Sequence, residues 1–366
     1  MSVEDNLRSV GSLIEIFDCR NSDGHDYPFY GINKDKSFMP TVADTNNLDN
    51  TKYKVVSKGD FVFSGMQTGR DVCIRIALFD KDEPVIISPA YTTFRVKDCA
   101  EVIPQYLFIQ FNRFEMDRYG WFLSDGSIRS NLDWDRFCEI EIPLPDITVQ
   151  QELVDTYNGL KALAEQNEAL IEPLSKACEA FIVDCKTKYP EVELGKFMIR
   201  GEKNSTKTIS KVLGVAQSGF ITPQKDPNES LANYKIMRYK AICYAPPLYN
   251  IKSDAIQIYE YEEPAVCSPI YEVFYVDEKY ILPHYLFIKL KRQEFKRYAE
   301  YYALGVRQTF NYELMEQVKI PLPPIEIQQS IVNLYNCLEE AKKIASEARE
   351  KLKTLCPALV QRAANS

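Results

Sequence analysis

Ile142-Pro143-Leu144-Pro145 recurs 178 residues later as Ile320-Pro321-Leu322-Pro323. A glutamine pair follows each copy at the same distance, Gln150-Gln151 after the first and Gln328-Gln329 after the second. Each proline fixes φ and disfavours a helical conformation at the residue before it. Both copies therefore predict an extended exit from a folded domain, and the motif divides the chain into two similar halves.

Upstream matches extend the repeat through each half. Ser88-Pro89-Ala90-Tyr91 recurs as Ser268-Pro269-Ile270-Tyr271, and Tyr106-Leu107-Phe108-Ile109 recurs as Tyr285-Leu286-Phe287-Ile288. Short β-rich runs separated by turn residues surround the Ser-Pro-x-Tyr match. Helical apolar spacing begins after Pro104, at the Tyr-Leu-Phe-Ile match. Each half is therefore predicted to contain a globular domain of mixed α/β structure.

The longest periodic pattern follows each glutamine pair. Apolar and small residues are spaced alternately by four and three positions from Leu153 to Phe181, and again from Leu334 to Leu359. This spacing is typical of coiled-coil helices, and Pro173 is expected to kink or interrupt the first helix. The apolar faces of the two helices bury each other most simply when the helices form an antiparallel pair. The alternative is that each helix docks separately on another protein.

The predicted fold is therefore α+β. Two similar globular mixed α/β domains are separated by two long antiparallel coiled-coil helices, and the halves form a pseudo-twofold repeat. The predicted boundaries are residues 1–146 and 188–324 for the globular domains, and residues 147–187 and 325–366 for the helices.

Charge is distributed unevenly along the 366 residues, which carry a net charge of -8. Residues 1–146 contain 16 basic and 24 acidic residues, whereas residues 188–324 contain 19 basic and 16 acidic residues. Phosphate contacts from basic residues normally supply much of the affinity for DNA. An acidic first half is therefore unusual for a DNA-binding protein.

Several classes of protein are disfavoured by the sequence. No apolar run approaches the ~20 residues of a membrane span, and the start of the chain does not resemble a signal peptide, so a cytoplasmic protein without membrane contact is expected. The ten cysteines are scattered without a CxxC pair, and only His25 and His284 are available as partners for metal binding. We expect reduced thiols and no metal site.

The sequence also lacks recognisable catalytic motifs. It contains no GxGxxG, no Walker loop and none of the motifs of an amino-methyltransferase, and neither histidine lies in a triad-like pattern. Asp133 and Asp135 near Arg129, or Glu139 and Glu141, are acidic pairs for which a solvated face is the favoured interpretation. No catalytic residue is therefore expected, and the chain is not expected to be an enzyme by itself.

Two similar domains with divergent interiors on a fixed spacer suit the reading of two short patterns at a set separation. The order of variable domain, Ile-Pro-Leu-Pro exit, glutamine pair and long helix, present twice, resembles the DNA-specificity subunit of type I restriction-modification systems. The resemblance covers nearly the whole chain. It implies that each globular domain is a target-recognition domain that reads one half of a split double-stranded DNA target.

The same resemblance implies a set of partners. The helix pair would act as a ruler and as the dock for two modification (methyltransferase) subunits, and restriction/translocase subunits would join the complex. S-adenosylmethionine, ATP and Mg²⁺ would then be bound by those partners, and no cofactor is expected on this chain.

Candidate DNA-binding residues in the first domain lie in two segments. Gln67 and Arg70 belong to a glycine-containing loop and have the side chains suited to adenine and guanine edges; the alternative is an ordinary surface loop. Ser127 and Arg129 lie in a turn with Gly126. Arg129 is placed either against phosphate or base, or in hydrogen bonds that fix its own turn.

The second domain contains a matching turn and a basic segment. Arg307 and Gln308 follow Gly305, with the same two interpretations for Arg307. Four lysines form a basic stretch that either contacts phosphate or is merely solvated, namely Lys203, Lys207, Lys211 and Lys225. The glutamine pairs 150–151 and 328–329 are expected to cap the long helices or to bind a partner rather than to touch bases.

The acidic first half favours a different class of function as well. A coiled-coil scaffold that bridges proteins, or an inhibitor that mimics the charge of DNA, fits it slightly better, whereas the positive second domain and the arginine-bearing turns do not. If the modification subunits supply most phosphate contacts, the isolated chain is expected to bind duplex DNA weakly.

Overall fold

Both copies of the Ile-Pro-Leu-Pro motif form a short strand that leads into a long helix. Strand β10 (Glu141–Pro143) precedes helix α6 (Ile147–Lys188), and strand β20 (Lys319–Pro321) precedes helix α11 (Ile325–Ala364). Each strand pairs antiparallel with the strand that opens its half, β1 (Leu7–Ser9) with β10 and β11 (Glu191–Glu193) with β20. The prolines are tolerated because each pairing is a two-stranded ribbon.

This computed structural model describes residues 7–42, 44–45, 48–126, 130–223, 230–303 and 308–364, with side chains described through residue 354. The chain separates into two units. Unit 1 contains residues 1–166 and 344–366, and unit 2 contains residues 167–343. Each long helix therefore contributes one segment to each unit.

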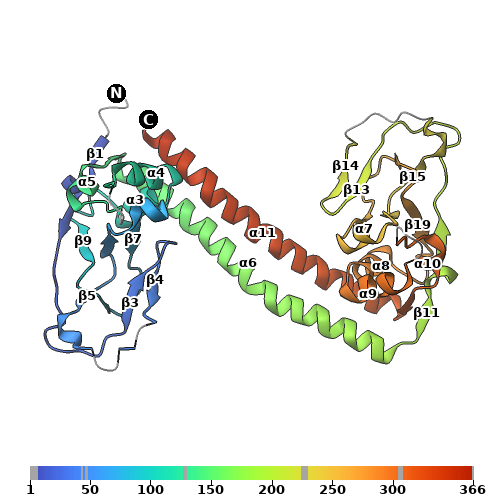
Figure 1. Cartoon of the computed structure of the whole chain (residues 1–366), viewed down its shortest axis with the longest axis horizontal. Coiled ribbons are helices and arrows are strands. Elements are labelled where there is room, and N and C mark those ends of the chain that lie inside the picture. The colour runs from blue at the N-terminus through green and yellow to red at the C-terminus, as the bar shows by residue number, and fades with distance from the viewer. Residues whose placement is uncertain are drawn as a thin grey trace. The chain divides into compact units, whose positions relative to one another are not determined.

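Unit 1 is built in three layers. A four-stranded antiparallel sheet, β2-β9-β6-β7, has helices on one face and the sheet β4-β3-β8-β5 on the other (Figure 1). The remaining elements of the unit, in chain order, are α1 (Val10–Leu13), β2 (Ile14–Ile16), β3 (Phe29–Ile32), β4 (Phe38–Pro40), the 3-10 helix η2 (Asn50–Lys52), β5 (Lys54–Val56), β6 (Phe61–Ser64), α2 (Thr68–Asp71), β7 (Arg75–Leu78), β8 (Val85–Ile87), β9 (Thr92–Val96), α3 (Pro104–Phe111), α4 (Phe114–Leu123) and α5 (Trp134–Glu139).

Alternation along strand β6 explains this layering. Phe61 and Phe63 point into the core beneath the helices, where Phe61 stacks on Phe94 with ring centroids 4.8 Å apart. Val62, between them, belongs to the core shared with the second sheet. Because successive side chains of a strand point to opposite faces, a strand that is apolar throughout must be covered on both sides.

Unit 2 repeats the same plan. Its central sheet is β12-β19-β16-β17, and Ile242 and Tyr244 of β16 face the helical core while Cys243 faces the smaller one. Its other elements are the 3-10 helix η3 (Leu194–Lys196), β12 (Met198–Arg200), β13 (Gly214–Ala216), β14 (Gly219–Ile221), the 3-10 helix η4 (Leu231–Asn233), β15 (Lys235–Met237), β16 (Ile242–Tyr244), α7 (Leu248–Lys252), β17 (Ile256–Ile258), β18 (Ala265–Cys267), β19 (Glu272–Val276), α8 (Pro283–Leu290), α9 (Gln293–Tyr302) and α10 (Tyr312–Glu316).

The long helices pack against each other within each unit. Unit 1 contains the beginning of α6 and the end of α11, whereas unit 2 contains the end of α6 and the beginning of α11, so the segments run antiparallel. Ile182 of α6 lies in the same core cluster as Ile331 of α11. The mixed α/β class and the pairing of the long helices are thus confirmed. Helix α6 continues through Pro173 without interruption.

One buried glutamine fixes the start of each long helix. Gln150 donates hydrogen bonds from Nε2 to the carbonyls of Pro145 (2.8 Å) and Glu101 (3.0 Å), and its Oε1 accepts one from the N–H of Ile103 (3.0 Å). Gln328 makes the same three bonds in unit 2, to Pro323, Tyr280 and Leu282, at 2.8–2.9 Å. Neither glutamine is exposed to solvent. We call each set of three bonds a glutamine lock.

Two observations bear on the expected class of protein. All nine cysteines whose side chains are described are free thiols. Among the described residues, no helix has the length and apolar character needed to cross a membrane.

Candidate nucleic-acid interface

In unit 1, the loop between β6 and β7 packs against the segment that follows the Gly-Arg turn. The N–H of Gly69 donates to the carbonyl of Ser130 (3.0 Å), and the N–H of Leu132 donates to the carbonyl of Gly65 (2.9 Å). We call residues 65–74 together with residues 130–132 the first loop surface. Two segments far apart in sequence thus form one backbone framework.

Glycine is required at two positions of this surface. A Cβ atom at Gly65 would lie 2.0 Å from the carbonyl oxygen of Leu132, and one at Gly69 would lie 2.4 Å from the Cβ of Ser130. The sequence feature that first marked this loop, its pair of glycines, therefore reflects close backbone packing.

Unit 2 contains an equivalent arrangement. The N–H of Leu248 donates to the carbonyl of Gln308 (2.9 Å), and the N–H of Phe310 donates to the carbonyl of Pro246 (2.8 Å). We call residues 245–254 together with residues 308–310 the second loop surface. Ser130 and Gln308, the equivalent acceptors, both have left-handed backbones, with φ of 46° and 45°.

The structure brings Gln67 and Arg70 together on the first loop surface. The Oε1 of Gln67 accepts a hydrogen bond from Nη2 of Arg70 (2.9 Å), and Nε of Arg70 lies 3.2 Å from Oδ1 of Asp71. The Arg70 side chain is still 60% exposed. An arginine braced on one side and open to solvent on the other suits a bidentate contact with a base or a phosphate.

Asp71 holds the pair of Gln67 and Arg70 in place. Its side chain is buried and forms an ion pair with Arg75 as well as with Arg70. The hydrogen bond from Arg75 is the largest cause that holds the pKa of the Asp71 carboxyl below its usual value. The carboxylate therefore stays ionised and keeps Arg70 in place.

Three of the four lysines predicted in the second domain, Lys203, Lys207 and Lys211, lie on another segment, between β12 and β13. Lys207 is exposed with a left-handed backbone (φ 54°), in a loop organised by the fully buried Asn204. Lys211 forms an ion pair with Glu263 (2.8 Å). The backbone of Lys203 pairs with that of Lys235 of β15 in an isolated antiparallel β-bridge. Gln308 is exposed and lies instead beside α7.

Four predicted DNA-binding residues lie outside the described part of the chain, namely Ser127, Arg129, Lys225 and Arg307. The described neighbours of the two turns are the segments that complete the two loop surfaces.

The two members of each glutamine pair are placed differently. Gln150 and Gln328 form the buried locks described above, so their amides face the inside of the chain. Gln151 and Gln329 are exposed and donate to Asp155 and Asn333 one helical turn later, each at 2.8 Å. Only the second glutamine of each pair is accessible to a partner.

Sequence reasoning missed a pair of exposed aromatic residues. Phe122 of α4 is 79% exposed and Tyr301 of α9 is 81% exposed, and each is the ninth residue of its ten-residue helix. The end of α4 adjoins the first loop surface, because a Cβ at Gly69 would contact Ser124 at 3.4 Å. Their equivalence becomes visible only when the two helices are aligned.

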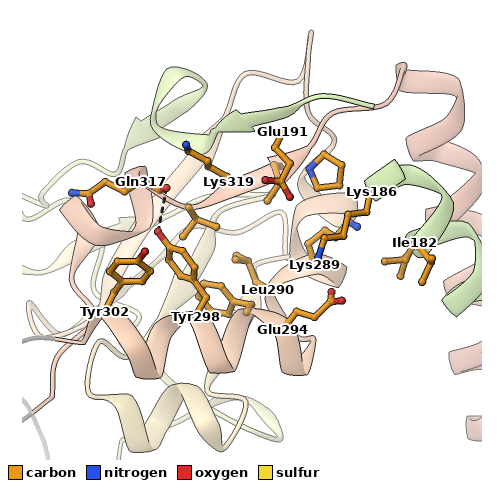
Figure 2. Close-up of a pocket in the computed structure, with 15 residues that line it drawn as sticks. Ile182, Lys186, Glu191, Lys289, Leu290, Glu294, Tyr298, Tyr302, Gln317 and Lys319 are labelled. Carbon is orange, nitrogen blue, oxygen red and sulfur yellow. Dashed lines mark hydrogen bonds between the residues drawn. The ribbon is translucent and has the colours of Figure 1, made fainter. Parts of the chain in front are cut away.

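Unit 2 also contains a pocket of about 390 Å³ beside the end of α6. Figure 2 shows Lys186 and Lys289 at one end of it, Tyr298 and Tyr302 towards the other, and the apolar Leu290 between them. Burial lowers the pKa of Lys289 to about 8. The amine lies over the ring of Tyr285, 5.6 Å from the centroid.

No group of three or more metal-ligating side chains occurs among the residues that the structure describes. The candidate surfaces described above instead present hydrogen-bond donors, arginine and exposed aromatic rings. Proteins use these groups to contact nucleic acids.

Comparison with known proteins gives a consistent result for the family. Residues 12–174 match the type I restriction modification DNA specificity domain. This stretch contains most of the acidic first domain and more than half of α6. Among curated proteins, none matches the sequence of the chain.

Solved structures extend the likeness to the fold of the whole chain. The S subunit of the type I restriction-modification system from M. genitalium is 13% identical, with a TM-score of 0.61 over 98% of this chain and 95% of that chain. The HsdS subunit from Thermoanaerobacter tengcongensis is 17% identical, with a TM-score of 0.39 over 98% and 96%. The resemblance predicted from the repeated motif is confirmed by the family match over residues 12–174, and the M. genitalium S subunit shares the fold.

Proposed function

We propose that this chain, whose residues 12–174 form a type I restriction-modification DNA specificity domain, reads a split DNA target as the specificity subunit of such a system. Each unit recognises one half of the target. The observation that carries the proposal is the repeated loop surface, in which the same backbone hydrogen bonds hold different side chains in the two units.

The side chains of the two surfaces support different specificities. The first surface presents Gln67 and Arg70, which suit adenine and guanine edges. The second presents Gln308 and the 70% exposed ring of Tyr249 on α7. A shared framework with unlike side chains is the arrangement expected when two different short sequences are read at a fixed separation.

The long helices serve as spacer and dock. Two modification subunits bind at equivalent positions, and the exposed Gln151 and Gln329 are repeated polar groups available to them. Methyl transfer from S-adenosylmethionine, and ATP- and Mg²⁺-dependent cleavage by restriction/translocase subunits, take place on those partners. The chain itself contributes recognition and not catalysis.

Single-molecule sequencing of host DNA tests this proposal. We expect methylated bases in a split motif, and we expect the methylation to disappear when the gene for this chain is deleted and to return when it is restored. A deletion of similar size in an unrelated gene is the control. Methylation that persists at the split motif after deletion would contradict the proposal.

A second candidate function is favoured by one observation, the excess of eight acidic residues in residues 1–146. A charge-mimicking inhibitor of a restriction system would use this acidity to occupy the DNA channel of its target. It predicts the opposite result in the same experiment, because deletion of an inhibitor increases methylation or restriction instead of abolishing it.

A further inference from the structure

The two loop surfaces are attached to the body of their units at one equivalent helix position. Asp117 is the fourth residue of α4 and Lys296 is the fourth residue of α9, and both helices contain ten residues. The position is therefore the same in the repeat, but it has opposite charge in the two units.

In unit 1 the position is a carboxylate that holds two other segments. The Oδ1 of Asp117 lies 2.7 Å from Nζ of Lys36 and accepts a hydrogen bond from the N–H of Ile74 (2.9 Å). The ammonium group of Lys36 also donates to the carbonyl of Phe111. The side chains of Lys36 and Asp117 are only 6% and 16% exposed. Helix α4 thus binds the β3–β4 turn and the end of the loop that carries Gln67 and Arg70.

In unit 2 the same position is an ammonium group. The Nζ of Lys296 lies 2.8 Å from Oδ1 of Asp254, and the two side chains are 11% and 28% exposed. Strand register makes Asp254 the equivalent of Ile74. Ile74 lies two positions before the residue that pairs with Phe63, and Asp254 lies two positions before the residue that pairs with Tyr244. Helix α4 therefore binds Ile74 and helix α9 binds Asp254, each the last residue of the longer segment of its loop surface.

Backbone strain explains why these loops need an attachment. Gln67 and Val72 of the first loop have left-handed backbones, with φ of 65° and 49°, and Asp254 of the second has φ of 60°. Non-glycine residues keep such conformations only where surrounding contacts impose them. Removing one member of a buried ion pair leaves the other charge without compensation, so the loop must move or hydrate.

We propose that the residues of the ion pairs Lys36–Asp117 and Lys296–Asp254 are positioning residues. Each pair holds the loop surface of its own unit in the conformation that recognises one DNA half-site. The inference rests on the proposed function. It adds that the two ion pairs act independently and that neither pair touches DNA. Specificity for each half of the target is therefore controlled by a buried pair in one unit only.

The test uses the complete complex with its modification subunits and duplexes based on the methylated motif of the wild type. One duplex is cognate, and two others have a single base pair changed in one half-site or in the other. The ratio of methylation rates, cognate over changed, measures discrimination at each half-site. We expect Lys36→Met to lower this ratio about tenfold at one half-site and Lys296→Met to lower it about tenfold at the other, because one wrong base pair typically weakens binding by roughly 5- to 150-fold.

Matched variants separate positioning from general stability. Asp117→Asn removes the charge of the first pair but keeps an oxygen for the Ile74 N–H, and it provides a second variant if Lys36→Met folds poorly. Lys296→Arg keeps the charge and is expected to restore discrimination. Lys58→Met breaks the exposed pair with Asp82 in unit 1 and is expected to change neither ratio.

Three results would overturn the inference or its premise. Lower melting temperatures with both discrimination ratios unchanged would mean that the pairs are only structural. Equal loss at both half-sites would mean that they do not act separately. A wild-type complex that discriminates at neither half-site would remove the proposed function as well, and this is measured before any variant.

Discussion

At the scale of single residues, the glutamine locks link three backbone groups that have no partner within a helix or strand. Replacing Gln150 by Leu removes the hydrogen-bond partner of the buried carbonyl of Pro145, of the carbonyl of Glu101 and of the N–H of Ile103. We expect the free energy of unfolding of unit 1 to fall by about 2–4 kcal/mol. The urea denaturation midpoint measures this change.

The neighbouring glutamine provides the control. Gln151→Ala removes only an exposed side-chain bond to Asp155, so its effect is expected to stay within about 0.5 kcal/mol. If both substitutions shift the midpoint equally, the lock does not have the role assigned to it. The same comparison applies to Gln328 and Gln329 in unit 2.

Lys289 makes stability depend on pH. Its pKa is about 8 in the folded chain because of burial, below the ordinary value of 10.5. The unfolded chain therefore holds this proton more tightly, so the cost of burying the charge is complete below pH 8 and disappears as the pH rises towards 10.5. We expect Lys289→Met to be more stable than the wild type at pH 7 by on the order of 1–2 kcal/mol.

Melting temperatures between pH 7 and pH 10 test this prediction. The advantage of Lys289→Met is expected to shrink across this range, whereas Lys186→Met, which removes an exposed amine from the same pocket, is expected to have little effect. A difference between Lys289→Met and the wild type that does not change with pH would argue against titration of the buried amine.

At the scale of elements, α6 contains an exposed proline in its interior. Pro173 cannot donate a hydrogen bond to the carbonyl of Ala169, and an interior proline costs a helix about 3 kcal/mol relative to alanine. We expect Pro173→Ala to stabilise the chain by about 1–3 kcal/mol, seen as a higher melting temperature. Glu172→Ala at the adjacent exposed position is the control, and a lower melting temperature for Pro173→Ala would show that the helix requires the proline.

Elements were predictable where their signals are local. The Ile-Pro-Leu-Pro exits, the proline-initiated helices and the heptad spacing depend on residues a few positions apart, and all of them occur twice. The loop with Gln67 and Arg70 was found because its glycines stand out. The ion pair of Asp117 was not found, because Lys36 is 81 residues away and the equivalent position in unit 2 has the opposite charge.

At the scale of the whole molecule, the two halves differ in charge more than in fold. Residues 1–146 have eight more acidic than basic residues, whereas residues 188–324 have three more basic than acidic residues. We expect the isolated chain to bind duplex DNA weakly and with a shallow dependence on salt. The complex with modification subunits is expected to have a steep dependence, because the slope counts the neutralised phosphates.

Binding titrations from low to physiological salt measure both slopes. Duplex of the same length without the methylated motif distinguishes specific from non-specific binding. Tight, sequence-specific binding by the isolated chain at physiological salt would contradict the view that the partners supply most phosphate contacts.

The reversed polarity of the two buried ion pairs also bears on how a repeated chain avoids misassembly. Two halves with the same framework invite an exchange in which α9 occupies the site of α4 during folding. That exchange would place Lys296 against Lys36, and the reciprocal one would place Asp117 against Asp254. Like charges buried in contact are strongly disfavoured, so the two pairs label each helix for its own half and act against intramolecular domain swapping.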